Sequence, residues 1–274
     1  MGPLKNLRGE ININNLENVK YEEEAKSAKL KEKKIVKLGL FWSQFYRELD
    51  RNDKDEKVLE GLHPHPNLKS LTIEWYRGKK FPPWVNDLSL FHNLIHIKLN
   101  WCIECEDVPT LGHIPCLRVL EIEGMGKVRR IGSEFYSYSD GSYRNTTTLF
   151  LALRILKLKK MYSLKEWKDA KELTGTGEVL VFSCLEKLTL YECPNLSSLL
   201  GVLSVIRHLE IIKCGIHELP SGLQFCASLQ NLDIRSCSNL KSISESLHSC
   251  VSLQKLVVDD FSKLRSLPGV PSVI

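Results

Sequence analysis

Two short patterns contain residue types that could support chemistry. Cys102 and Cys105 have the two-residue spacing of zinc ligands, but no second close pair of cysteines or histidines accompanies them. Residues 174–177 (TGTG) lack both the Lys-Ser/Thr ending of a phosphate-binding loop and the third glycine of a dinucleotide motif. No serine, histidine and acid grouping follows a nucleophile-elbow pattern. The sequence therefore predicts a non-enzyme with no catalytic residue, no metal and no cofactor.

The composition narrows the class of protein further. The 274 residues carry a formal charge of +5 from scattered Lys and Arg, so a nucleic-acid partner is not predicted. No apolar run is long enough to span a membrane, and the N-terminus lacks a secretory leader. Nine cysteines are an odd number, which in a chain without a leader favours free thiols. We therefore expect a cytoplasmic protein with reduced cysteines.

One phrase recurs along the chain and must position any functional side chain. It reads Leu-x-x-Leu-x-Leu-x-x-Cys, with Ile, Val or Phe as substitutes, and its regular copies begin at Leu185, Ile206, Leu229 and Leu253. Earlier copies begin at Ile35, Leu68, Leu94, Leu117 and Leu153, and a tenth, slightly out of register, includes Leu7, Ile11, Ile13 and Leu16. This is the frame of a leucine-rich repeat, in which single units cannot bury their own apolar edge and must stack.

The frame predicts an α/β repeat solenoid, a right-handed horseshoe. Its concave side should be a parallel sheet and its convex side mostly irregular or 3₁₀ structure. The predicted strand centres are Leu38, Leu71, Ile97, Leu120, Leu156, Leu188, Leu209, Leu232 and Leu256. Cysteines at the ninth position, such as Cys193, Cys214 and Cys237, should be buried as small apolar residues in line with one another.

The domain prediction is a single leucine-rich-repeat domain over residues 1–274. Its regular part covers about 183–268, and irregular repeats with insertions precede it. Residues 17–34 are predicted as a charged, solvated helix, and residues 43–58 as a loop leading into a short helix from Glu56 to Leu62. Further insertions are predicted at 132–148 and 168–181.

Side-chain alternation places the third, fifth and seventh residues of each repeat on the concave face. Tryptophans at the eighth position of three successive repeats should lie in line just beyond the strands. They either anchor a partner or cover the strand ends and pack on the inserted loops. The candidate protein-binding surface consists of Phe41, Trp42, Glu74, Trp75, Lys98, Asn100, Trp101, Glu121, Glu123, Lys157, Lys159, Tyr191, Glu210, Ile212, Asp233, Arg235 and Asp259.

Several phrases are more specific than the repeat frame. They include residues 15–19 (NLENV), 38–42 (LGLFW), 81–85 (FPPWV), 108–117 (VPTLGHIPCL) and 124–136 (GMGKVRRIGSEFY). In this order they resemble the leucine-rich-repeat region of coiled-coil-type plant disease-resistance proteins, the nucleotide-binding immune receptors. The resemblance covers nearly the whole chain.

The resemblance implies a protein-binding module that recognises a pathogen effector or a guarded host protein. It also implies restraint of a nucleotide-binding (NB-ARC) switch domain, in cis or in trans. The coiled-coil and NB-ARC domains of such receptors are absent from this sequence, so a truncated receptor or a fragment is expected. In a full receptor, a nuclear or peripheral-membrane location is an alternative to the cytoplasm. The alternative function is a leucine-rich-repeat substrate adaptor of a ubiquitin ligase lacking its F-box.

Overall fold

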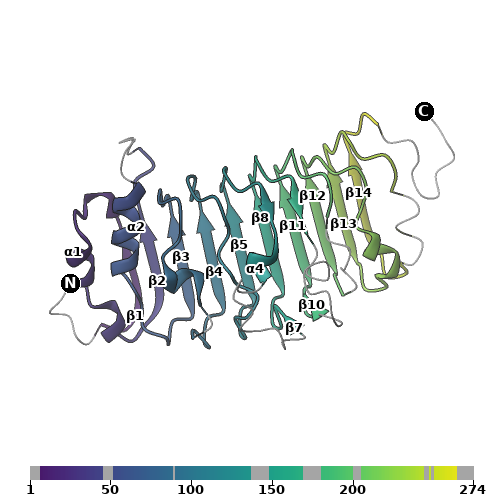
Figure 1. The fold of residues 1–274 in the computed structure, drawn as a ribbon. Coiled ribbons are helices and arrows are strands. Elements are labelled where there is room, and N and C mark those ends of the chain that lie inside the picture. Colours follow the sequence, from purple (N-terminus) through teal and green to yellow (C-terminus); the bar gives the residue numbers. More distant parts are fainter. Residues whose placement is uncertain are drawn as a thin grey trace.

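The computed structural model describes residues 7–45, 52–88, 90–136, 148–168, 180–199, 205–243, 247 and 250–263. Ten of its strands form one parallel sheet, the main sheet, in which spatial order follows chain order along an elongated array (Figure 1). The strands are β1 (Gly9–Ile13), β2 (Ile35–Phe41), β3 (Ser70–Glu74), β4 (His96–Asn100), β5 (Val119–Glu123), β8 (Ile155–Lys159), β11 (Lys187–Tyr191), β12 (His208–Ile212), β13 (Asn231–Arg235) and β14 (Lys255–Asp259). A repeat solenoid is thus confirmed, and all nine predicted strand centres lie in strands.

The register explains why the leucine frame alone specifies this sheet. Equivalent positions pair without offset, as in Leu38 with Leu71 and Leu209 with Leu232. The fourth and sixth residues of each unit point into the core, where Leu71, Leu120 and most of their counterparts are fully buried. Only the first pair, β1 with β2, contains a register shift, which agrees with the slightly displaced first unit.

The residue after each strand has a backbone conformation that the sequence frame does not predict. From the third strand onward the described eighth positions have positive φ: Trp75, Trp101, Gly124, Lys160, Glu192, Lys213, Ser236 and Asp260. Their backbone N–H groups continue the ladder, as when Trp101 donates to Glu123 O at 2.7 Å and Lys160 donates to Tyr191 O at 2.7 Å. A left-handed residue costs about 1–2 kcal/mol when it is not glycine, and this hydrogen bond offsets part of that cost.

The first insertion is not the single solvated helix that the sequence predicted for residues 17–34, so that prediction was wrong. The segment divides into a 3₁₀ turn η1 (Leu16–Asn18), the short helix α1 (Glu22–Lys26) and a second 3₁₀ turn η2 (Leu30–Glu32). Lys29 has a φ of 47°, which interrupts the helix before η2. Ala25, Ala28 and Leu30 are buried, so the segment covers the core instead of standing in solvent.

The second insertion contains helix α2 (Asn52–Gly61), which starts earlier than the predicted helix at Glu56. Val58 and Leu59 on this helix are fully buried. The Glu56 carboxylate accepts hydrogen bonds from the backbone N–H groups of Lys79 and Lys80, at 2.8 and 3.1 Å. Helix α2 is thereby attached to the turn after β3. Helix α3 (Pro83–Asn86) follows, and Trp84 donates from Nε1 to Leu59 O at 2.9 Å.

The third and fourth insertions bury aromatic side chains, of which the quoted sequence phrases contained only Phe135 and Tyr136. These insertions and the residues next to them contain helix α4 (Ser133–Tyr136) and two small parallel sheets. In one sheet β6 (Arg130–Ile131) pairs with β9 (Glu166–Trp167), and in the other β7 (Thr148–Leu149) pairs with β10 (Leu180–Val181). Phe135, Phe150 and Phe182 pack in a row with ring centroids 4.8 and 4.9 Å apart. Trp167 donates from Nε1 to the Tyr136 hydroxyl at 2.9 Å. The remaining residues of these two insertions, including 174–177, lie outside the described part of the chain.

The convex connections within the regular repeats are short and irregular, with one 3₁₀ segment, η3 (Ser221–Phe225), among the residues described there. In the part of the chain that the structure describes, no helix combines the length and apolarity needed to cross a membrane.

Candidate functional site: the exposed face and edge of the main sheet

The third, fifth and seventh residues of each repeat share the exposed face of the main sheet, here called the sheet face. The fifth residues form a continuous column because Lys98 pairs with Glu121, and Glu121 pairs with Lys157. Neighbouring strands lie about 4.8 Å apart, so side chains in one column contact each other. The same register places the seventh residues in a second column: Phe41, Glu74, Asn100, Glu123, Lys159, Tyr191, Ile212, Arg235 and Asp259.

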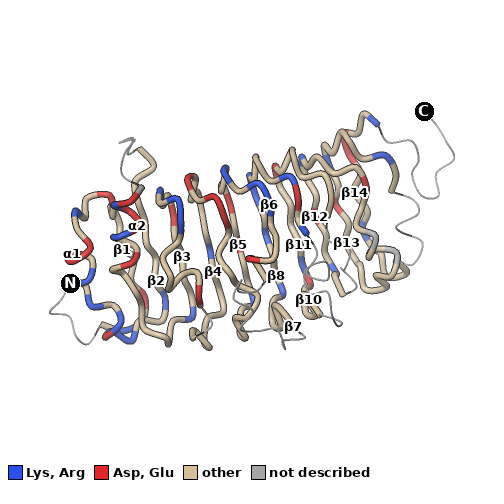
Figure 2. The backbone as a smooth tube through the Cα atoms, in the orientation of Figure 1, with Lys and Arg blue, Asp and Glu red and all other residues tan. Residues whose placement is uncertain are grey.

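Charges of both signs follow one another along these columns (Figure 2). Glu121 lies 3.4 Å from Lys157 Nζ and 3.5 Å from His96 Nε2. Lys98, between Thr72 and Glu121, has no ion pair or hydrogen bond of its side chain among the described residues. The central strands therefore combine the Glu121–Lys157 ion pair with an ammonium group that is available to a ligand.

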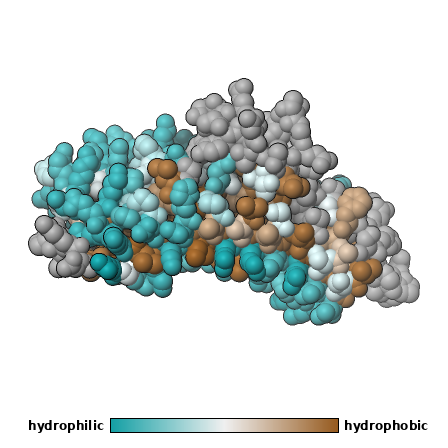
Figure 3. Space-filling view, turned by 90° about the horizontal axis from the view of Figure 1, so that it is seen from below, coloured by the Kyte–Doolittle hydropathy of each residue, from teal (hydrophilic) through white to brown (hydrophobic). Residues whose placement is uncertain are grey.

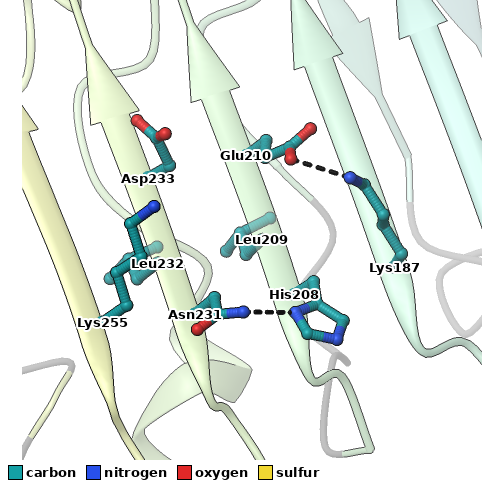
Figure 4. Close-up of a pocket in the computed structure, with 8 residues that line it drawn as sticks. All are labelled: Lys187, His208, Leu209, Glu210, Asn231, Leu232, Asp233 and Lys255. Carbon is teal, nitrogen blue, oxygen red and sulfur yellow. Dashed lines mark hydrogen bonds and ion pairs between the residues drawn. The ribbon is translucent and has the colours of Figure 1, made fainter.

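The C-terminal strands form a shallow polar cavity of about 170 Å³ on the sheet face (Figure 4). Glu210 is bound by Lys187 at 2.7 Å and by the Thr189 hydroxyl at 2.8 Å. Burial raises the pKa of the Glu210 carboxyl, but these two groups outweigh that effect and hold the pKa below its usual value. Asn231 Nδ2 lies 2.8 Å from His208 Nδ1 across the same cavity.

The rim of this cavity includes two more charged residues. Asp233 binds Arg235 through two hydrogen bonds of 2.7 and 2.8 Å. Lys255 extends towards Asp233 from the last strand (Figure 4). Two carboxylates, Glu210 and Asp233, lie between the amines of Lys187 and Lys255 along the cavity, which is suited to polar side chains of a ligand and contains no arrangement of a nucleophile with a base.

The edge at which the strands end, here called the exit edge, contains the tryptophans singled out in the sequence. Trp75 and Trp101 stack with ring centroids 5.1 Å apart and planes within 3° of each other. Gly124 occupies the next eighth position, and a Cβ there would lie 2.5 Å from the Trp101 ring. Lys160 crosses this gap, so that its Nζ lies 4.8 Å from the Trp101 ring centroid and 2.9 Å from Glu123.

Two of the predicted surface residues are not accessible. Trp42 is only 4% exposed and packs edge-on against Tyr76, with centroids 5.2 Å apart. Its neighbours on helix α2 cover it, so the alternative of packing on an insertion holds for this residue. Asn100 is 7% exposed between its neighbours in the seventh column. The other predicted residues remain at least partly exposed.

Asp55 is a buried acid that sequence reasoning missed. It lies on helix α2 and is 4% exposed. Burial raises the pKa of its carboxyl to about 6, while the Trp42 indole and Lys54 partly offset this effect. Nothing in the local sequence separates Asp55 from the other acids of this segment, because its burial depends on how α2 packs on the sheet.

The cysteines at ninth positions form a ladder of buried thiols. Cys102, Cys193 and Cys237 donate from Sγ to the sixth-position carbonyl of the preceding repeat, at 3.9, 3.8 and 3.6 Å. Cys105 also donates, to Gly78 O at 3.2 Å. Burial raises the pKa of Cys102 to about 12, which disfavours the thiolate that a metal would need. Among the described residues no group of three or more possible metal ligands comes together.

His63 and His65, which flank Pro64, make hydrogen bonds within the turn before β3. His65 Nδ1 accepts from the backbone N–H of Asn67 at 3.1 Å, and His63 Nδ1 lies 2.8 Å from Pro64 O. The His63 ring also packs near Trp84, with centroids 5.7 Å apart.

The edge at which the strands begin is chemically different from the exit edge. Viewed from that side, apolar side chains form an interrupted band along the array (Figure 3). Leu151, Val205 and Val251, each a few residues before a strand, are 54%, 39% and 84% exposed. Aromatic and charged groups thus gather at the exit edge, and aliphatic groups at the opposite one.

The stacked frame, the parallel main sheet and the columns on it define a leucine-rich-repeat solenoid. Residues 1–125 match the family model of R13L1/DRL21 LRRs. The chain is 32% identical over 252 residues to "Putative disease resistance RPP13-like protein 1" of Arabidopsis thaliana, which covers 88% of this chain and 23% of that protein. It is 34% identical over 250 residues to "Disease resistance protein RGA2" of Solanum bulbocastanum, covering 89% of this chain and 24% of that protein.

A third relative, "Putative disease resistance protein RGA1" of Solanum bulbocastanum, is 31% identical over 273 residues, which is 98% of this chain and 25% of that protein. These similarities support a leucine-rich-repeat region of the kind found in plant disease-resistance proteins. The chain spans about a quarter of the length of these curated relatives.

Proposed function

We propose that this chain is the protein-binding module of a plant intracellular immune receptor and acts in the cytoplasm without catalysing a reaction. The single observation that carries the proposal is the continuous sheet face, on which the fifth and seventh columns run across the strands without offset. Such a surface offers many adjacent side chains and no concentrated reactive group. Its partner would be a pathogen effector or a guarded host protein.

The sheet face and the adjoining exit edge provide the two features that specific binding requires. Polar groups held by neighbours, such as Glu210 between Lys187 and Thr189, are already oriented before a partner arrives. Aromatic groups, such as the stacked Trp75 and Trp101, provide large contact area with little loss of conformational freedom. Pre-oriented groups reduce the entropic cost of association.

We further propose that the chain restrains a nucleotide-binding switch domain, in cis within a longer receptor or in trans. The family resemblance supports this role, and the relatives are named as disease-resistance proteins. The nucleotide-binding part of such a receptor is chosen so that its expression alone triggers cell death in leaf tissue, and coexpression of this chain should reduce that response. An unchanged response would contradict the restraining role.

Proximity labelling in leaf tissue tests the binding role. The chain, fused to a labelling enzyme, is compared with a sheet-face variant, Lys98→Glu with Lys157→Glu. A charge-matched control, Lys31→Glu with Lys34→Glu, changes exposed lysines of the first insertion. We expect the sheet-face variant to lose a discrete set of labelled proteins that the control retains. Identical sets for all three proteins would refute the sheet face as the binding surface.

A further inference from the structure

At the exit edge a cation of the chain itself, the Lys160 ammonium group, lies between an aromatic ring and a carboxylate. Lys160 Nζ lies 4.8 Å from the ring centroid of Trp101 and 2.9 Å from the carboxylate of Glu123, a seventh-position residue. The ring face attracts the ammonium group through its quadrupole, and the carboxylate neutralises it. Gly124 leaves the space that this arrangement needs, because a Cβ there would overlap the Trp101 ring.

A tryptophan and a seventh-position acid also occur at the other end of the stack, without a cation, although here the acid belongs to the repeat of the ring itself and not to the neighbouring repeat, as Glu123 does. Trp75 lies parallel to Trp101 and presents only one ring face to it. Glu74, the seventh-position residue directly before Trp75, is partly exposed and takes part in no ion pair within the described ranges. Along that part of the chain no ring or cation contacts the outer face of Trp75 either.

The residues nearest to Trp75 along the chain supply neither a ring nor a cation to its outer face, for reasons that the structure shows. Trp42, the preceding eighth-position residue, is buried and packs on Tyr76 instead of extending the stack. Arg77 is the nearest cation along the chain, but its Nη2 donates to Gln44 O at 3.2 Å. Glu74 is therefore a carboxylate without an ion pair among the described residues, and it lies directly before a partly exposed indole.

We propose that the outer face of Trp75, together with the Glu74 carboxylate, binds a lysine or arginine side chain of a protein partner. This inference rests on the proposed protein-binding function and names the chemistry of one contact. The partner's cation would contact one ring face and one carboxylate, Trp75 and Glu74, as Lys160 contacts Trp101 and Glu123. Charge complementarity selects a basic segment over an acidic one.

Nuclear magnetic resonance of the full chain, labelled with ¹⁵N at its tryptophan indoles, tests the proposal. The five tryptophans give separate indole signals, and that of Trp75 is assigned with a Trp75→Phe variant. The probe is a blocked six-residue peptide of alternating glycine and arginine, and the control peptide replaces arginine with glutamine. We expect a saturable shift of the Trp75 signal with the arginine peptide alone.

Two matched variants make the result specific. Glu74→Gln should weaken peptide binding roughly three- to tenfold, as expected for loss of one charge-assisted contact. Glu123→Gln removes the equivalent seventh-position acid from the site that Lys160 already fills, and it should leave the Trp75 response unchanged. Unchanged signals of the buried Trp84 and Trp167 verify that each variant is folded.

A third variant asks whether the arrangement is general. Lys160→Asn removes the internal cation while keeping a residue type that tolerates positive φ, so the Trp101 signal should begin to respond to the peptide. The proposal is overturned if Trp75 shows no saturable shift, if the glutamine peptide acts equally, or if Glu74→Gln has no effect. Each of these results would leave the labelling comparison of Lys98 and Lys157 variants unaffected, so the two proposals can fail separately.

Discussion

The N-terminal strands β1–β5 and the C-terminal strands β11–β14 belong to one sheet but are supported differently. The C-terminal repeats begin 21 to 24 residues apart, and Cys193, Cys214 and Cys237 occupy the same buried ninth position. The N-terminal repeats have Tyr76, Cys102 and Met125 there instead, with helices inserted between strands. The pairing register is nevertheless equally regular from β2 onward in both regions.

The comparison shows that the repeat frame specifies the strands and that the connections can differ without changing the strand pairing. Leucines at the fourth and sixth positions, with the backbone ladder, are sufficient to specify the sheet in either region. The connections instead determine which extra groups are buried and which reach the surface. Helix α2 buries Trp42 and Asp55, for example, whereas Trp75 and Trp101 stay partly exposed beyond it. The following predictions test this separation, beginning with the largest effect.

Truncation of a frame leucine in the regular region should have the largest effect on stability. Leu209 is fully buried, so Leu209→Ala should reduce the free energy of unfolding by about 2–5 kcal/mol. Leu256 has the same place in the frame on β14 but is 40% exposed, and Leu256→Ala should cost less than half as much. Urea denaturation measures both. Equal costs would mean that frame position, and not burial, determines the contribution.

The N-terminal region should lose stability as pH rises, because of a buried acid on helix α2. The pKa of Asp55 is raised from 3.8 to about 6 in the folded protein, so folding favours the protonated acid. The associated stability is present below about pH 4 and is lost as pH rises through about 6, up to about 3 kcal/mol in total. Asp55→Asn cannot ionise and should remove this loss, becoming more stable than wild type at pH 7.5.

Thermal and denaturant melts between pH 4 and pH 8 measure this difference. Asp53→Asn, on the exposed side of the same helix, is the matched control and should follow the wild-type profile. A wild-type profile that coincides with that of Asp55→Asn would show that the carboxyl does not ionise in the folded state.

The exit edge should be sensitive to a single methyl group at one glycine. Gly124 has a φ of 73°, and an added Cβ would overlap the Trp101 ring. Gly124→Ala should therefore cost at least about 1–2 kcal/mol and change tryptophan fluorescence, because the ring must move. Gly126→Ala is the control, since nothing lies within 4 Å of its added Cβ. A fluorescence spectrum unchanged by Gly124→Ala would contradict the described packing.

Changes on the sheet face should have the smallest effect on stability. Lys98 makes no ion pair among the described residues, so Lys98→Ala should change the free energy of unfolding by no more than about 0.5 kcal/mol. Calorimetry would measure that change. A loss greater than about 1 kcal/mol would show that this residue contributes to the fold and that surface and frame are not separate.

Much of the fold could be predicted from the sequence because the frame repeats. Alternation of leucines specifies strand positions, and period-two geometry then specifies the columns that include Glu121, Lys157 and Glu210. The burial of Trp42 could not be predicted, because it depends on where helix α2 packs and not on the eighth position itself. The positive φ of Trp75 and Trp101 was missed for a similar reason: only glycine signals that conformation in a sequence.

The eighth-position ladder has a consequence for how such a protein can diversify. Each bond in this ladder is made by a backbone N–H, as from Glu192 to Ile212 O and from Ser236 to Asp259 O, both at 2.9 Å. Tryptophan, glycine, lysine, glutamate, serine and aspartate all occupy the position with the same chain geometry. Natural variation can therefore exchange the exit-edge side chains, and with them the range of partners recognised, without changing the path of the backbone.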